Sequence, residues 1–493
     1  MKWALPLFFL YLIFYLFSCQ TSEVKNSTSH SYSNNLLVTI GDRKITVNDF
    51  IKRCEYVPRP NYCKNNNYIH KKIALNSLIA EKLLALEFEK NNYNFTRAQK
   101  NLILGRKEQS MRQMMLKKNG FNKVKPDTNT IKVVSRQLQK TYDLAFLNVN
   151  EQQKKIITSS NYKSLREIKE NIIDTLPIGS KKVTFDEDMP MQIKEILYFT
   201  QPQKNILYGP ILLSKTNFMF FEINGWNTLV SVTDDQKRQS FNDAQEAYNE
   251  LNALKIYERY ILNLMRGKKI DFYPNVFQLF AGKLSKIYLI EKNKKESVMQ
   301  NKMWDNELEE LKEISSFDHL NDIQDQNLLS FDNKIFSVAR VLKLIKTHPL
   351  VFRNRKVSQD SFGNELKYAL ADLFRDLEIT KRAYKLNYDQ YEDIISIEDK
   401  WKDYISSEVV KSKLAENHTR NDVFKAICLK IDSLQQHYSG IIKIDTDKFE
   451  KIQLTSIDLN VIYTNQAYPQ FEPSFPILTD DHLLDYGKKY NFN

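Results

Sequence analysis

The sequence predicts a mostly helical α+β protein in which two similar modules follow one another and the first carries an inserted α/β domain. Three observations lead to this prediction. Residues 36–51 and 328–342 share one pattern, residues 74–88 and 369–383 share a second, and residues 141–226 have no counterpart later in the chain. A chain of 493 residues is too long for one hydrophobic core, so several domains are expected.

Each module is expected to begin with two short strands and a helix. The strands of 36–51 are separated by a turn at Gly41-Asp42, and those of 328–342 by a turn at Asp332-Asn333. The long helices that follow, at 74–88 and 369–383, repeat apolar residues at three- and four-residue spacing. That spacing is typical of a helix with one buried face.

Each module is also expected to end in a helix and a strand. The first ending is a helix over 257–265 and a strand over 268–273, and the second is a helix over 431–438 and a strand over 441–445. An early strand and a late strand of the same module would pair and close it. The predicted parts are module 1 at 36–140 and 227–290, the insert at 141–226, module 2 at 315–470 and a C-terminal tail at 471–493.

The N-terminus predicts a signal peptide and a lipid anchor. Residues 4–17 form an apolar run that is too short to span a bilayer, and it ends in Leu16-Phe17-Ser18-Cys19. This ending resembles the lipobox of bacterial lipoproteins, which implies a signal peptide at 1–18, acylation of Cys19 and a flexible tether at 19–35. An ordinary secretory peptide, or an uncleaved anchor with a chance cysteine, is the alternative. The residue after Cys19 is Gln20, whereas an aspartate at this position commonly retains lipoproteins at the inner membrane. This difference favours the outer membrane.

Composition narrows the function classes. Glycine is scarce, at 11 residues, which argues against a glycine-rich nucleotide-binding fold. The net charge of +12 is spread among 60 acidic residues without a dense basic block. We therefore expect no nucleic-acid partner, but a solvated surface with some affinity for anionic lipid headgroups.

The remaining cysteines and the histidines predict no metal site and no cofactor. Cys54 and Cys63 flank a turn-rich segment and form either a local disulfide, which export would permit, or two buried thiols. Cys428 lies in an apolar helical pattern and is expected in a core. The histidines are scattered, and no cysteine–histidine cluster has metal-ligand spacing.

Two stretches carry a resemblance to a family. Residues 38–50, with Ile45-Thr46 before a helix, and the Leu78-Ile79-Ala80-Glu81-Lys82-Leu83 core resemble the N-terminal chaperone region of SurA, PrsA and PpiD-like periplasmic folding factors. The end of the insert, 208–223, looks like the final hairpin of a parvulin (PpiC-like) prolyl isomerase. The short helix expected within 189–199, before this hairpin, looks like the parvulin helix that carries the family's pocket Met and Phe. The resemblance implies an apolar client pocket lined by Met189, Met191, Phe199 and Phe218. The alternative is that these four side chains fill the core of a small domain.

The parvulin resemblance does not extend to the catalytic residues. The family uses two histidines on facing strands, and the matching positions here hold Asp143 or Leu144 and Phe218 or Met219. No histidine occurs between His70 and His319, and the family's glycine-rich loop is absent. We therefore predict a parvulin-like domain without catalytic residues.

The resemblance implies a membrane-anchored periplasmic chaperone that binds unfolded or nascent envelope proteins. Aromatic residues, 12% of the chain, would supply contacts to such clients, although most of them must fill cores. A structural lipoprotein subunit of an envelope assembly is the alternative, because fold alone does not decide function. An active peptidyl-prolyl isomerase is the third hypothesis, and the missing histidines argue against it.

Overall fold

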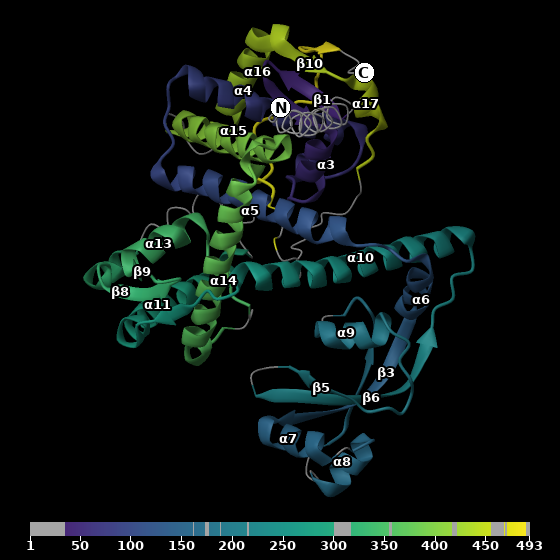
Figure 1. The fold of residues 1–493 in the computed structure, drawn as a ribbon. Helices are drawn as coiled ribbons and strands as arrows, with labels where there is room; N and C mark the ends of the chain where they lie inside the picture. The colour runs from purple at the N-terminus through teal and green to yellow at the C-terminus, as the bar shows by residue number, and fades with distance from the viewer. Residues whose placement is uncertain are drawn as a thin grey trace, which may run out of the picture. The chain divides into compact units, whose positions relative to one another are not determined.

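The computed structural model describes residues 35–299 and 317–489, except 161, 173–176, 188, 214–215, 354–356, 417–421, 455–467 and 469–470. The predicted signal peptide, Cys19 and all of the tether but its last residue lie outside the described residues. The described chain is mostly helical with small, mainly antiparallel sheets, so the predicted α+β class is confirmed at that level. It divides into two compact units, the first up to Gln113 and again from Gly267, and the second Met114–Arg266 (Figure 1).

The first unit contains a sheet that joins the two ends of the described chain. Its strand order is β11-β10-β1-β2. Strand β1 pairs antiparallel with β2 on one side and with β10 on the other, where Val38 lies opposite Ile444. The short strand β11 adds in parallel to β10. The strands are β1 (Leu36–Ile40), β2 (Arg43–Thr46), β10 (Ile442–Ile444) and β11 (Lys488–Lys489).

A second sheet of this unit has the order β7-β8-β9. Asp332 and Asn333, between β8 and β9, both have positive φ, as a two-residue hairpin turn of type I′ requires. Strands β8 and β9 pair as β1 and β2 do, since both hairpins have a register shift at the same place, Leu36/Val38 and Asn327/Leu329. The strands are β7 (Ile270–Phe272), β8 (Asn327–Phe331) and β9 (Lys334–Ser337).

Both hairpins lead into a helix whose first turn is capped by a hydroxyl group. The Thr46 hydroxyl accepts from the Asp49 amide before α3 (Val47–Glu55), and the Ser337 hydroxyl accepts from the Arg340 amide before α13 (Val338–Thr347). The predicted strand–turn–strand–helix order is therefore confirmed for both segments.

The predicted pairing of early and late strands is wrong. Strand β1 pairs with β10 from the second half of the chain, and β7 from the first half pairs with β8. Backbone hydrogen bonds do not distinguish one late strand from another, so side-chain burial decides. Ile442 and Ile444 of β10 are fully buried, whereas β7 is only half buried.

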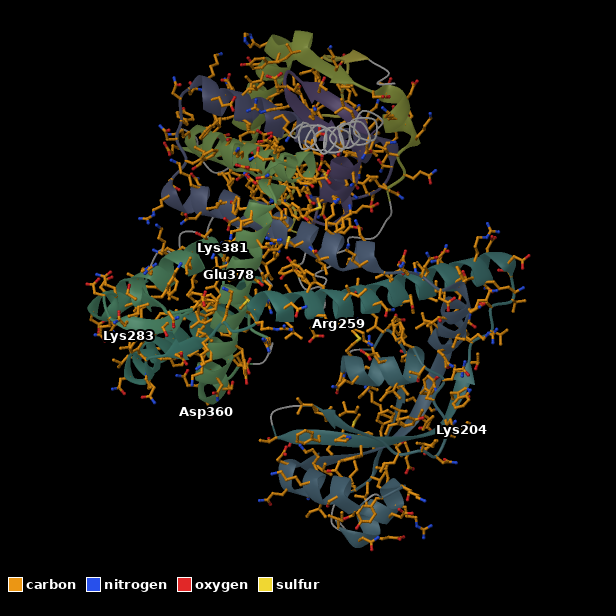
Figure 2. All side chains as sticks on the ribbon, in the orientation of Figure 1. Lys204, Arg259, Lys283, Asp360, Glu378 and Lys381 are labelled. Atoms are coloured by element: carbon orange, nitrogen blue, oxygen red, sulfur yellow. The ribbon has the colours of Figure 1, made fainter. Side chains whose placement is uncertain are left out.

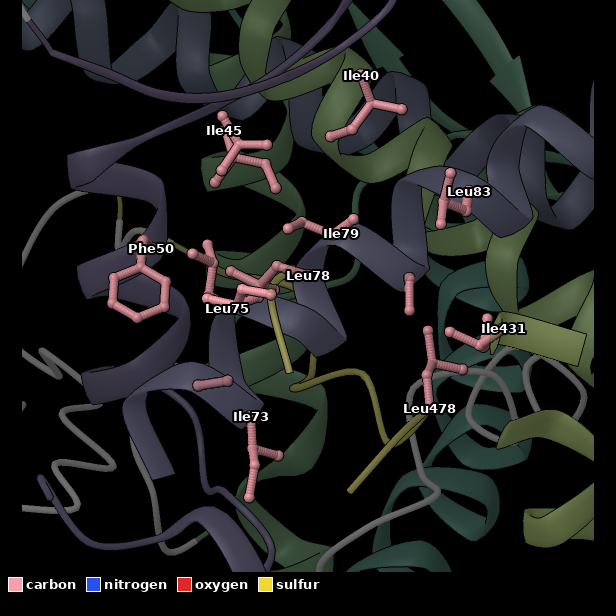
Figure 3. Close-up of a cluster of buried hydrophobic side chains, with 14 of the residues drawn as sticks. Ile40, Ile45, Phe50, Ile73, Leu75, Leu78, Ile79, Leu83, Ile431 and Leu478 are labelled. Carbon is pink, nitrogen blue, oxygen red and sulfur yellow. The ribbon is translucent and has the colours of Figure 1, made fainter. Parts of the chain in front are cut away.

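The helices of the first unit contain the predicted helices 74–88, 369–383 and 431–438. Helix α4 lies in the main core, where side chains of β1, β2 and α3 meet Ile431 of α16 and Leu478 of the C-terminal segment (Figure 3). The remaining helices are α4 (Tyr68–Lys90), α5 (Arg97–Asn119), α11 (Pro274–Met299), α14 (Gln359–Lys385), α15 (Glu392–Ala415), α16 (Val423–Tyr438) and α17 (Thr446–Lys451), with 3₁₀ turns at Asn61–Cys63, Phe317–Ile323, Tyr388–Gln390 and Ser439–Ile441.

The second unit is built on a four-stranded antiparallel sheet of order β4-β3-β6-β5. One face packs against α9, and the other packs against α7 and α8 (Figure 1). Helices α6 and α10 pack together beside them. The elements are α6 (Thr128–Leu138), β3 (Lys140–Asn150), α7 (Glu151–Ser160), α8 (Leu165–Asn171), β4 (Gly179–Val183), α9 (Met191–Tyr198), β5 (Tyr208–Leu212), β6 (Asn217–Thr228) and α10 (Asp234–Met265), with a 3₁₀ turn at Phe121–Lys123.

Charged side chains of both signs are distributed along the helices of both units (Figure 2). On α14, for example, Lys381 forms an ion pair with Glu378 at 3.4 Å. Among the residues that the structure places, no helix combines the length and the apolar character needed to cross a membrane.

Candidate functional site

The first unit contains a cavity of about 610 Å³ bordered by β2, α3, α4 and α15. Most of the side chains that line it are charged, and three are aromatic. The residues described around it are Asp42, Arg43, Lys44, Ile45, Asp49, Arg53, Leu78, Glu81, Lys82, Phe88, Glu89, Tyr93, Asn94, Phe95, Lys100, Glu392, Ile395, Ser396, Asp399, Lys400, Lys402, Asp403 and Ser406.

Helix α4 brings two charged side chains into the interior. Glu81 and Lys82 are both buried, although they interrupt an apolar stretch of the helix. A buried charge is tolerated only when it is paired and hydrogen-bonded. Each of the two therefore needs a partner from a neighbouring element.

Glu81 is paired with Arg53 of α3. Two guanidinium nitrogens of Arg53 donate to the two carboxylate oxygens of Glu81 at 3.1 and 2.7 Å. The same guanidinium donates to the carbonyl oxygen of Ser474 at 2.8 Å. Burial alone would lower the pKa of Arg53, but the Glu81 carboxylate raises it overall, so the guanidinium stays charged.

Lys82 belongs to a chain of alternating charges. Its ammonium group lies 2.8 Å from Asp403 of α15, and Asp403 also accepts from Arg43 of β2 at 3.0 Å. Arg43 in turn pairs with Glu89 at 2.8 Å. These ion pairs connect side chains of β2, α4 and α15 at the cavity.

Lys400 of α15 forms the third charged group. Its ammonium lies 2.6 Å from Glu472 and 3.2 Å from Asp49. Burial alone would lower the pKa of Lys400, but the carboxylates of Glu472 and Asp49 raise it overall. Burial alone would raise the pKa of Asp49, but Lys400 and the Thr46 hydroxyl lower it to about 2.

Three aromatic side chains, Phe88, Tyr93 and Phe95, also line the cavity. The rings of Phe88 and Phe95 stack with centroids 4.7 Å apart, and Tyr93 meets Phe88 edge-on at 5.9 Å. No histidine or cysteine is among the residues described around the cavity. No group of three or more histidine, cysteine, aspartate or glutamate side chains in the described chain is placed to hold a metal ion. The arrangement suits the binding of a group with both polar and apolar parts.

The structure does not bring the four predicted pocket residues together. Met189 and Phe199 pack at the edge of the core on the α9 face of the sheet. Phe218 belongs to the core on the opposite face, with α7 and α8, and Met191 is exposed. Adjacent residues of a strand point to opposite faces, so Met219 takes the place on the α9 face.

The positions that the parvulin resemblance assigns to histidines hold other side chains in this protein. Leu144 and Met219 are both part of the core on the α9 face. Asp143 lies nearby on β3, where its carboxylate accepts from the Ser180 hydroxyl at 3.4 Å. These strands offer no imidazole with which to move a proton.

Cys54 and Cys63 are free thiols in the structure. Both are buried in the main core of the first unit. Burial raises the pKa of each thiol to about 12. Cys428, which was expected in a core, is only half buried.

We expect Cys54 and Cys63 to resist thiol reagents in the folded protein at mildly alkaline pH, because the thiolate is the reactive species and burial disfavours it. In alkylation experiments read by mass spectrometry and carried out without a reductant, both cysteines should be labelled in the denatured protein and neither in the folded protein. If neither is labelled in denatured, unreduced protein, a disulfide joins them.

We expect Asp49→Asn to lower the free energy of unfolding near neutral pH by roughly 1–2 kcal/mol, because the carboxylate loses its ion pair with Lys400. The folded pKa, about 2, lies below the ordinary 3.8, so the contribution is present above the ordinary value and is lost as the pH falls through the folded one. Urea denaturation at several pH values should show the two proteins converging towards pH 2. A constant difference would contradict this assignment, and Asp271→Asn, at an exposed position of β7 in the same unit, is the control.

Sequence reasoning missed this charged cavity. The signal was present, since Glu81-Lys82 lies inside the apolar core pattern of a helix that becomes buried on all sides. Arg53, Lys400 and Asp403 gave no comparable signal, because each lies in an ordinary polar stretch.

Comparison with known protein families, curated proteins and solved structures found no match to the chain.

Proposed function

We propose that the chain is a membrane-anchored periplasmic chaperone of the SurA/PrsA type, with two related modules and a parvulin-like insert that does not catalyse isomerisation. The shared register of the two hairpins supports the related modules. The strand and helix order of residues 140–228 supports the insert. Unfolded envelope proteins would be its clients.

One observation carries the chaperone proposal. Directly after β6, Leu229, Val230 and Val232 are 80%, 71% and 77% exposed. Three highly exposed aliphatic side chains within four residues are uncommon on a protein that binds nothing. Aliphatic side chains without polar partners bind apolar client segments with little dependence on sequence.

An aggregation assay tests the proposal. The chain should suppress light scattering by a heat-denatured protein, and the triple replacement of Leu229, Val230 and Val232 by serine should weaken this suppression strongly. Leu429→Ser, at a 61% exposed position in the other unit, is the matched control and should leave suppression intact. Equal suppression by the triple variant and the control would contradict the assignment of this surface.

A refolding assay tests the absence of isomerase activity. Proline-limited refolding has a time constant of roughly 10–100 s at 25 °C, so acceleration is easy to detect. We expect none at sub-stoichiometric protein. Strong acceleration that disappears on deletion of 141–226 would make the chain an isomerase.

The anchor is tested by Cys19→Ser. We expect this variant to be left uncleaved or to leave the membrane fraction, because the acylated thiol is lost. Cys428→Ser is the control and should fractionate as the unchanged chain does. Processed, membrane-bound Cys19→Ser would refute the lipoprotein proposal, and stoichiometric co-purification with one partner would favour a structural subunit.

A further inference from the structure

The C-terminal segment 471–487 is bound in the first unit as an extended chain. It contains no helix or strand, although eight of its 17 residues are buried. Pro473 and Pro476 lack an amide hydrogen and disfavour a helix in the residues before them. The segment packs against α3 and α4, and the surface of these two helices that holds it is called the groove below.

Side chains of the groove hold the main chain of this segment. Asn76 and Ser77 are fully buried neighbours on α4, and they donate to the carbonyl oxygens of Asp481 at 2.9 Å and Thr479 at 3.4 Å. Arg53 of α3 donates to the carbonyl oxygen of Ser474 at 2.8 Å. A carbonyl oxygen is present in every residue type, so these three contacts do not depend on the side chains of the bound segment.

Apolar side chains of the segment fill the groove between these contacts. Phe475, Leu478 and Leu484 are buried in the main core of the unit. At the end of the segment, Lys488 and Lys489 add as a short strand to the open edge of β10. Main-chain hydrogen bonds, apolar pockets and strand addition are the ways in which proteins bind extended peptides.

We propose that this groove is a binding site for extended, apolar, proline-containing segments of unfolded polypeptides, and that residues 471–489 occupy it in the resting protein. The proposal rests on the proposed chaperone function and names a binding site for it. A client segment enters the groove as the C-terminal segment leaves. The ion pair of Glu472 with Lys400, at 2.6 Å, adds a contact that a client without an acidic residue lacks, so the C-terminal segment competes well when clients are scarce.

The test keeps the whole chain but allows exchange. A protease recognition sequence replaces 458–463, which lie outside the described residues, and the protein is cut after it has folded. We expect the cut segment to stay bound during gel filtration. An excess of a synthetic peptide of residues 471–489, or of a reduced and alkylated unfolded protein, should displace it while the circular dichroism of the remaining chain is retained.

Peptide variants separate groove binding from general stickiness without affecting the fold. Leu478 is 0% exposed and Leu483 is 53% exposed in the same segment. The Leu478→Asp peptide should compete at least about ten-fold more weakly, because a carboxylate enters an apolar pocket, whereas the Leu483→Asp peptide should compete as the unchanged peptide does.

Three outcomes would overturn the proposal. The first is that no competitor displaces the segment. The second is that release of the segment unfolds the first unit. The third is that the peptide of residues 471–489 displaces the segment and the unfolded protein does not. If the uncut chain suppresses aggregation but no competitor displaces the C-terminal segment of the cut protein, the groove is not the client site and the proposed chaperone function still stands. If the unfolded protein displaces the segment but the chain does not suppress aggregation, the groove binds unfolded polypeptides and the proposed chaperone function is wrong.

Discussion

Replacing Glu81 by alanine should lower the free energy of unfolding of the first unit by about 3–5 kcal/mol, because Arg53 would remain charged and buried without its carboxylate. Both side chains are almost completely buried, and the pair has two-pronged geometry with distances of 3.1 and 2.7 Å. Urea denaturation followed by circular dichroism would measure the loss.

The double variant Arg53→Met/Glu81→Leu distinguishes the cost of an unpaired charge from a general loss of packing. Apolar residues of similar size remove both charges together, so most of the stability should return. Glu170→Ala breaks the ion pair with Arg166 on the surface of α8 and should cause no measurable change. A double variant as unstable as Glu81→Ala would mean that the volume of the pair matters more than its charge.

Residues 36–290 expressed alone should fail to fold their part of the first unit. Strand β1 and helix α4 are buried against β10, α16 and the C-terminal segment, all of which come from the second half of the chain. Without them, Val38, Ile40 and the buried face of α4 would be exposed to water. Amide hydrogen exchange at β1 and α4 should then be fast, and adding residues 317–493 should slow it.

The second unit provides the internal control for this experiment. Strands β3 and β6 pair along their whole length within residues 114–266, so their amides should stay protected in the fragment. Protected amides in β1 and α4 of the isolated fragment would show that the first predicted module folds alone.

The sequence was sufficient for the local structure of this protein. The two hairpins that begin the predicted modules, the helices at 74–88 and 369–383, and the final hairpin of the insert at 208–223 were all predicted, whereas α7 and β4 were not. The reason is physical, since turn residues, caps and the spacing of apolar residues act over a few positions. The absence of histidine between His70 and His319 could likewise be read directly.

Only the tertiary structure decided which distant segments meet. It paired β1 with β10 rather than with a late strand of its own half. It placed Phe218 on the face of the sheet opposite Met189, and it paired Glu81 of α4 with Arg53 of α3. Backbone hydrogen bonds and single charges have no preferred partner within the sequence, because their energy depends on the burial and the geometry that packing creates around them.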